Sequence, residues 1–477
     1  MSPTSHSKLL RLTLLLLTAG TLLAVGCSSS MNASMAGPTG SAFVVGTDAP
    51  MAAVTSFLVQ VNSIDAIDAK GDSVPLLGSA QTVDFAQYNG LQTLLAAGKV
   101  TAGTYTSIRI TLGSGTIGYL DTSTGGAPTI KTEAATFTTS TVNLTLPKPL
   151  VVVHAGAPVG LRVEFNLAKS IQVNSSGQIT GQVDPVFTVK AVGEENAEAH
   201  IDDLVGSVVS VNLGAQSFIV QQSRGLQITV DVSSQTDWDG GASLSTLKTG
   251  DIVKVSGDLG SSVLTLNADG VTLFSTHGFY ANGLVTYVHP ASGAATSFDL
   301  YVSGVQPANT GVQLGQIAQV NLTGSEQFHV AWMHGKMSQY LFNSSTMLAG
   351  QNVAIGGAAS GAANANAVSV NRVMLRSWGF NGTVVAGSVN ASAGSFQMMV
   401  NGFDGVLIPQ AVTVYIEGET EFRDGFTAMT DVGDSSTNNN VRVVGLLFRD
   451  ATSGKAIILA HFVDDMQENQ GNNQGDN

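Results

Sequence analysis

Three aromatic residues are the side chains of this sequence best suited to binding a ligand. Trp238, Phe328 and Phe422 each closely follow an acidic residue, in a short motif that recurs three times along the chain. Such a ring can form a platform for a sugar or another ligand. It can equally close the end of a small β-barrel, and recurrence at one position of a repeat favours this structural role. Ligand binding by the three rings is therefore a speculative prediction.

Enzyme motifs are scarce. Residues 113–118 fit Gly-x-Gly-x-x-Gly, but turn-rich sequence follows instead of a helix, which favours a glycine-rich loop over a dinucleotide site. On a strand, His329 and His334 would point to opposite faces, which disfavours a zinc site. The Gly-x-Ser-x-Gly motif of serine hydrolases does not occur. We therefore expect no catalytic residue, metal or cofactor. A hydrolase remains an alternative, because two catalytic carboxylates can be distant in the sequence and meet only in the fold.

The first residues have the pattern of an export signal. Lys8 and Arg11 precede an apolar run at 14–17, which is too short for a good membrane span, and small residues follow it. We therefore predict a signal peptide at residues 1–26. Residues 28–40 are mostly small and would form a flexible tether.

The end of this signal, Leu22 to Cys27, resembles the lipobox of bacterial lipoproteins, with Ala24 where leucine is commonest. The resemblance implies cleavage before Cys27 and lipidation of that residue, so that the lipid would attach the protein to a membrane. An ordinary secretory signal with an incidental cysteine is the alternative. Ser28 after the cysteine resembles the outer-membrane sorting pattern of Gram-negative lipoproteins. It implies an exported protein on the periplasmic or the surface face of that membrane.

The composition indicates a large all-β protein. Hydrophobic residues make up 43% and charged residues 11%, with 54 glycines. The charged share is far below the roughly 25% of an average soluble protein. Many short strands joined by turns would explain this mix. The net charge of −14, without a basic stripe, argues against nucleic acid as a partner.

Residues 41–192 predict a β-sandwich with one short helix. Apolar and polar residues alternate at 108–112, 142–146 and 161–167, as in half-buried strands. The short helix is predicted at Asn89 to Ala97, where three leucines would share one face before Gly98.

Five motifs of this unit, in order, resemble a known family. They are Thr47–Pro50, Thr82–Phe85 with Asn89–Gly90, Ala102–Arg109, Phe165–Ser170 and Asp184–Phe187. This order is similar to the lipoprotein family catalogued as domain of unknown function 4382. The resemblance implies a β-rich, surface-anchored domain and no catalytic residues.

After an acidic segment at 193–203, predicted to be a linker, the chain repeats itself. Gly206, Gly283 and Gly382 each open a copy, and we expect them at the start of the first strand of three similar barrels. Each is followed by a Ser-Phe strand. The pattern resembles a second family, domain of unknown function 5666, of small OB-like barrels. The predicted units are residues 204–275, 279–376 and 378–463, followed by a disordered tail at 464–477.

The main functional hypothesis is a non-catalytic, lipid-anchored cell-envelope protein with a role in adhesion, scaffolding or ligand capture. The alternative is a carbohydrate- or solute-binding lipoprotein that serves an uptake system. An envelope hydrolase is the weaker alternative. The expected partners are the membrane, through the lipid on Cys27, and a carbohydrate or an envelope protein. The sequence does not predict an oligomeric state.

Overall fold

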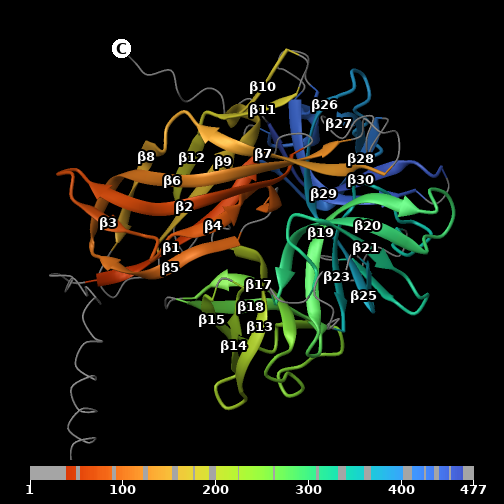
Figure 1. Ribbon diagram of the computed structural model, residues 1–477, viewed down its shortest axis with the longest axis horizontal. Helices are drawn as coiled ribbons and strands as arrows, with labels where there is room; N and C mark the ends of the chain where they lie inside the picture. Colours follow the sequence, from red (N-terminus) through yellow and green to blue (C-terminus); the bar gives the residue numbers. More distant parts are fainter. Residues whose placement is uncertain are drawn as a thin grey trace, which may run out of the picture.

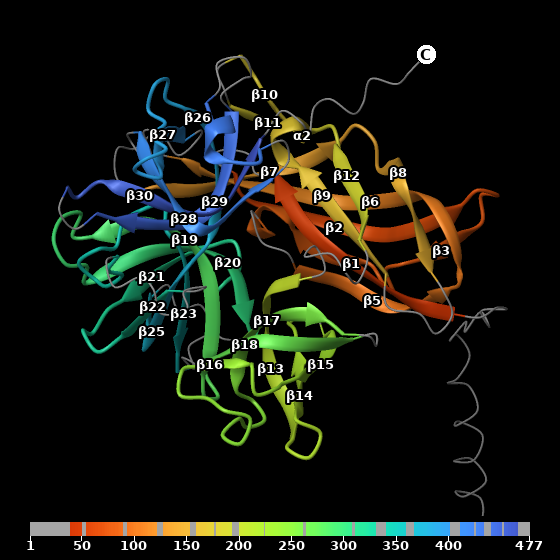
Figure 2. The same ribbon diagram turned by 180° about the vertical axis from the view of Figure 1, so that it is seen from behind.

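The computed structural model describes residues 39–49, 54–88, 93–121, 127–152, 159–175, 178–192, 200–223, 225–260, 264–307, 311–330, 340–358, 367–400, 411–423, 426–433, 440–450 and 453–465. Most of these residues form β-strands (Figures 1 and 2), which confirms the predicted all-β class. The predicted signal peptide, Cys27 and most of the tether lie outside the described residues. Within them, no helix is both long and apolar enough to cross a membrane.

Two sheets form the N-terminal sandwich. The first has the order β12 (Phe187–Val192), β9 (Val159–Asn166), β1 (Thr39–Ala49) and β5 (Thr93–Thr101). The second has the order β10 (Ile171–Val173), β11 (Ile179–Val183), β7 (Thr129–Phe137), β6 (Gly103–Asp121), β2 (Val54–Asp68) and β3 (Ser73–Pro75). Here β4 (Gln81–Asp84) also pairs with β2, and β8 (Thr141–Val152) with β6. Among the described residues, helical structure is limited to short turns: η1 (Phe85–Tyr88), α2 (Leu167–Ser170) and, far along the chain, η3 (Met429–Asp431).

Four phenylalanines fill the centre of the sandwich. Phe165 stacks on Phe187 with ring centroids 4.2 Å apart. Phe57 and Phe85 pack edge-on against Phe165, at 5.2 and 5.0 Å. The alternation predicted for 161–167 is confirmed, because every second side chain of β9 points into this core.

The helix predicted at 89–97 is wrong where the structure describes it. Residues 93–101 form β5, which pairs antiparallel with β1. Leu94 and Leu95 point to opposite faces of this strand. Leu95 enters the sandwich core and Leu94 the core of the first barrel. Burial on both faces therefore produced the run of leucines that resembled one face of a helix.

Three barrels with one strand plan follow. Barrel 1 is a ring of β13 (His200–Asn212), β14 (Ser217–Gln221), β15 (Gln227–Asp231), β18 (Thr265–Ser275) and β17 (Ile252–Leu259), with β16 (Asp237–Asp239) beside β18. Barrel 2 has β19 (Phe279–His289), β20 (Ser297–Gln306), β21 (Ile317–Asn321), β22 (Gln327–Val330) and β23 (Asn352–Gly357), with β24 (Ala367–Ser369) and β25 (Arg372–Arg376) in the place of β18. Barrel 3 is closed by β26 (Trp378–Val384), β27 (Ser395–Val400), β28 (Val412–Arg423), β30 (Ala456–Asp465) and β29 (Asn440–Arg449).

Three predicted boundaries shift. Residues 39–40 belong to β1 and not to the tether, and residues 464–465 belong to β30 and not to the tail. Residues 200–203 of the predicted linker form the start of β13, because they pair with the end of β17, His200 opposite Asp258. Charged residues occur here because this end of the strand pair is partly exposed to water.

The equivalence of the three glycines is confirmed. Each glycine lies opposite the second residue of a neighbouring strand. Gly206 lies opposite that of β17, Gly283 opposite that of β23, and Gly382 opposite that of β29. They sit inside the first strand, however, and not at its start. A Cβ atom would come within 2.5, 1.7 and 2.3 Å of a carbonyl oxygen of the second strand. This close approach of backbones explains why only glycine fits.

The barrels share their cores with their neighbours. From the sandwich, Phe43 and Leu94 pack into the core of barrel 1, and Leu120 packs into that of barrel 3. Leu446 and Phe448 of barrel 3 pack into the core of barrel 2. The three barrels thus lie beside the sandwich, and barrel 2 lies between barrels 1 and 3, as Figures 1 and 2 show.

A polar cleft as the candidate functional site

The structure places the three aromatic residues at equivalent points of the barrels. Trp238 lies on β16, Phe328 on β22 and Phe422 on β28, each beside a valine of the last strand. Each ring is partly buried and packs against the core of a barrel. This is the arrangement expected of a plug, and the three rings lie in three different barrels.

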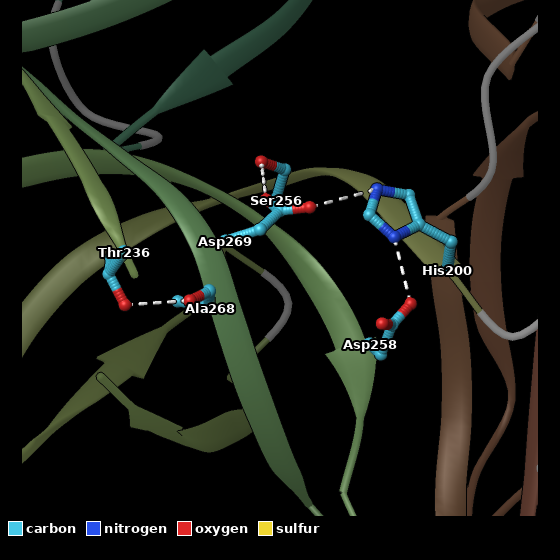
Figure 3. Close-up of polar contacts among 6 residues, drawn as sticks. All are labelled: His200, Thr236, Ser256, Asp258, Ala268 and Asp269. Atoms are coloured by element: carbon cyan, nitrogen blue, oxygen red, sulfur yellow. Dashed lines mark hydrogen bonds and ion pairs between the residues drawn. The ribbon is translucent and has the colours of Figure 1, made fainter. Parts of the chain in front are cut away.

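The recurring motif around these rings has a structural use. The Thr236 hydroxyl donates to the Ala268 carbonyl oxygen at 2.7 Å (Figure 3), and the Thr420 hydroxyl donates to that of Ala460 at the same distance. Glu326 takes the threonine position in barrel 2, where its carboxylate accepts from the backbone of Thr323. In each barrel, the residue two positions before the aromatic ring is therefore held by a hydrogen bond.

The glycine-rich stretch at 113–118 is part of the long strand β6, so the loop predicted there is wrong. A Cβ on Gly118 would lie 2.3 Å from the Ser56 hydroxyl, and one on Gly115 would lie 2.9 Å from the Ala135 methyl. These glycines therefore serve close side-chain packing across the sheet. His329 lies on β22, whereas His334 falls outside the described residues. In the part of the chain that the structure describes, no three His, Cys, Asp or Glu residues are grouped to hold a metal.

A histidine cluster on barrel 1 is drawn in Figure 3. The His200 Nδ1 atom lies 2.9 Å from Asp258, and its Nε2 atom lies 3.8 Å from Asp269. The Ser256 hydroxyl donates to Asp269 and not to the imidazole. A serine nucleophile would need the imidazole as its base. With both carboxylates largely exposed, the cluster instead joins β13 to β17 and β18 at the surface.

A polar hollow lies where the sandwich meets barrels 1 and 2. This cleft has a volume of about 600 Å³, within the range of small-molecule sites. It is lined by residues of all three units: Leu58, Thr82, Asp84, Asp203, Val205, Gln222, Ser223, Tyr280, Asn282, Ser303, Gly304, Val305, Gln306, Val312, Gln313 and Leu314. None of the three plug aromatics is among them, so tertiary packing has made a site that the sequence motifs did not mark.

Asp84 contributes the first of the two charged side chains of the cleft. It ends β4 and is 4% exposed, and its carboxylate accepts the backbone N–H of Phe57 at 2.8 Å. Burial raises the pKa of this carboxyl to about 7, against the opposing effect of the Phe57 and Ala86 N–H groups that donate to it. Near neutral pH the cleft therefore contains a carboxyl that can gain or lose a proton.

Asp203 is the second, and it forms a buried ion pair. Its Oδ2 atom bonds Nη2 of Arg376, which lies on β25 of barrel 2 and is 3% exposed. Burial acts to lower the pKa of Arg376, but Asp203 and Tyr280 outweigh it and hold that pKa above its usual value. The pair thus joins barrel 1 to barrel 2, with Asp203 in the lining of the cleft.

Several buried polar atoms of the cleft lack a partner. The Tyr280 hydroxyl, the Gln306 Oε1 atom and the Asp203 Oδ1 atom have no hydrogen-bond partner within the described part of the chain. Tyr280 is 2% and Gln306 6% exposed. The amide nitrogen of Gln306 donates to the Ser207 hydroxyl at 2.9 Å, which fixes the orientation of its oxygen. Leaving such an atom unsatisfied costs about 1–3 kcal/mol, which a bound ligand would offset.

The sequence did not predict these four residues as a site. In the sequence, Asp84 stands within a family motif and Asp203 within a predicted acidic linker, and neither context marks a binding site. The residues come from β4, β13, β19 and β20. No local spacing connects strands so far apart in the chain, and a hydrophobic pattern does not reveal which strand ends will meet.

Comparisons with known proteins identify two domains of this chain. No curated protein matches it. Solved structures that share some similarity are drosophila Unr CSD456 (9% identity, 54% of this chain and 94% of that one, TM-score 0.13) and MbnP from Methylosinus trichosporium (14% identity, 32% and 98%, TM-score 0.16). TM-scores this low support no conclusion about fold or function. Two family models match: the domain of unknown function DUF4382 at residues 39–180, and the domain of unknown function DUF5666 at residues 205–265. The DUF4382 resemblance is thereby confirmed, and the DUF5666 resemblance is confirmed for the first of the three barrels. The chain carries a DUF4382 domain followed by a DUF5666 domain.

Proposed function

We propose that this protein is a non-catalytic envelope protein that captures a small polar solute in the cleft between the sandwich and barrels 1 and 2. The observation that supports this proposal is a pair of unpartnered polar atoms on deeply buried side chains, the Tyr280 hydroxyl and the Gln306 Oε1 atom, in a hollow of about 600 Å³. Polar groups of this kind orient a ligand in most small-molecule sites.

Two carboxylates in one cleft are also the minimal equipment of a glycosidase. In this cleft each carboxylate already has a structural partner. Asp84 accepts backbone N–H groups of the sandwich, and Asp203 holds Arg376. This favours capture over hydrolysis. The carbohydrate alternative gains no support from a stacking platform here, because Tyr280 is the only aromatic residue among the described residues that line the cleft.

A ligand screen tests capture. Sugars, polyols, amino acids and alkylamines at millimolar concentration are added to the purified full-length protein, and thermal unfolding is followed. A ligand at 100 times its Kd should stabilise the protein by about 2.7 kcal/mol, a shift of several degrees. Leu314→Trp, an exposed residue at the cleft, should abolish the shift by filling the space.

Leu213→Trp is the matched control, since Leu213 is also an exposed leucine but lies in the β13–β14 turn and does not line the cleft. It should leave the shift unchanged. Failure of every compound, or an equal shift in wild type and Leu314→Trp, would reject the cleft as a capture site.

Attachment to a membrane through Cys27 is a separate part of the proposal. Each buried CH₂ group contributes about 0.8 kcal/mol, so several acyl chains would anchor the protein stably. Cells fed a labelled fatty acid should label the wild type and the control Ser28→Ala, but not Cys27→Ser. Label on Cys27→Ser would contradict the lipobox interpretation.

A further inference from the structure

The charge of the cleft points to the chemistry of its ligand. Among the described residues that line the cleft, Asp84 and Asp203 are the only charged side chains, and both are acidic. Arg376 is bonded to Asp203 and does not line the cleft. An anionic ligand would therefore meet like charge from these two residues, whereas a cation would meet carboxylates in a partly dry site where charge interactions are strong.

The unpartnered atoms agree with this charge. The Gln306 Oε1 and Asp203 Oδ1 atoms can only accept hydrogen bonds, and the Tyr280 hydroxyl can accept one as well as donate one. A ligand that brings several N–H donors would satisfy all three. A carboxylate or phosphate ligand, which accepts, would satisfy only the tyrosine.

From charge and hydrogen-bonding capacity together, we propose that the solute captured in the cleft is a small organic amine that carries a protonated nitrogen. This inference rests on the proposed function and adds the class of ligand. The protonated nitrogen lies among Asp203, Gln306 and Tyr280, and the remainder of the ligand extends along the apolar side of the cleft formed by Val205, Val305 and neighbouring residues.

Three compounds with one carbon skeleton provide the test: putrescine, 1,4-butanediol and succinate, measured by calorimetric titration against the full-length protein at pH 7.5. Putrescine should bind at least tenfold more tightly than the diol, and succinate should not bind. Leu314→Lys should weaken putrescine binding several-fold and Leu314→Glu should strengthen it. Leu213→Lys, with the same change of charge elsewhere, should have no effect.

The pH dependence of putrescine affinity is a second test. The titratable groups around the cleft are Asp84 on β4, Asp203 on β13, Tyr280 on β19, Tyr301 on β20 and Arg376 on β25. Of these, Asp84 has its pKa near 7, so it gains negative charge between pH 6 and pH 8. The amine stays protonated over this range, as lysine does. Putrescine affinity should therefore rise several-fold from pH 6 to pH 8 in the wild type and stay level in Asp84→Asn.

Two sets of results separate the proposals. Tight binding of the diol or of succinate in a manner sensitive to Leu314→Trp would overturn the amine ligand and leave capture intact. Absence of putrescine binding, or putrescine binding that Leu314→Lys does not change, would also overturn the amine ligand. Capture in the cleft would itself be overturned by failure of the whole ligand screen, or by an equal thermal shift in wild type and Leu314→Trp.

Discussion

Gly283→Ala should be among the most damaging substitutions in this protein, with a loss of about 4 kcal/mol or more in the free energy of unfolding. The added Cβ would lie 1.7 Å from the carbonyl oxygen of Tyr301, a backbone atom that cannot rotate away. Strands β19 and β20 would have to separate at the centre of barrel 2. Both faces of β19 are buried over Phe279–Thr286, so the separation would disturb the cores of its neighbours too.

The equivalent glycines provide a graded series. The closest carbonyl contact is 2.3 Å for Gly382 and 2.5 Å for Gly206, so their alanine variants should follow Gly283→Ala in this order. Gly418→Ala is the control, because a Cβ on this strand glycine of β28 meets nothing within 4 Å. Urea unfolding measures all four. A loss for Gly283→Ala no larger than that for Gly418→Ala would contradict the close backbone approach.

Arg376→Met should be the second severe substitution, with a loss of about 3–5 kcal/mol, because it leaves the Asp203 carboxylate partly buried without its cation. The side chains of Arg376 and Asp203 are 3% and 17% exposed. They join barrel 2 to barrel 1 across 173 positions of sequence. The loss should appear in urea unfolding and as earlier proteolytic cleavage at the barrel 1–barrel 2 junction.

A double variant separates the charge effect from the packing effect. Arg376→Met combined with Asp203→Leu removes both charges, and apolar replacement of a buried pair is often neutral. About half or more of the stability lost in Arg376→Met should return, which a double-mutant cycle measures. A loss below about 1 kcal/mol for Arg376→Met would show that the pair contributes no more than a surface ion pair.

The sequence by itself determined the strands and their repetition. Alternation at 108–112, 142–146 and 161–167 identified strands β6, β8 and β9, because a side-chain period of two is a local property of an extended chain. Gly206, Gly283 and Gly382 identified three copies of one barrel, because a close backbone approach at one point of a fold excludes every larger residue. The Ser-Phe pairs likewise mark the first residues of β14, β20 and β27.

Only the tertiary structure decided how the sandwich and the barrels pack together and which residues meet at their junctions. The helix predicted over Leu94 and Leu95 is a strand in the structure, because the burial of these residues on two faces depends on barrel 1 packing against the sandwich. The cleft depends on the same packing. Asp84 and Asp203, with Tyr280, are distant in the chain and meet only because three separate units share one junction. Local patterns record which face of a strand is buried, but the partner that buries it, and the polar groups that meet there, follow from long-range packing.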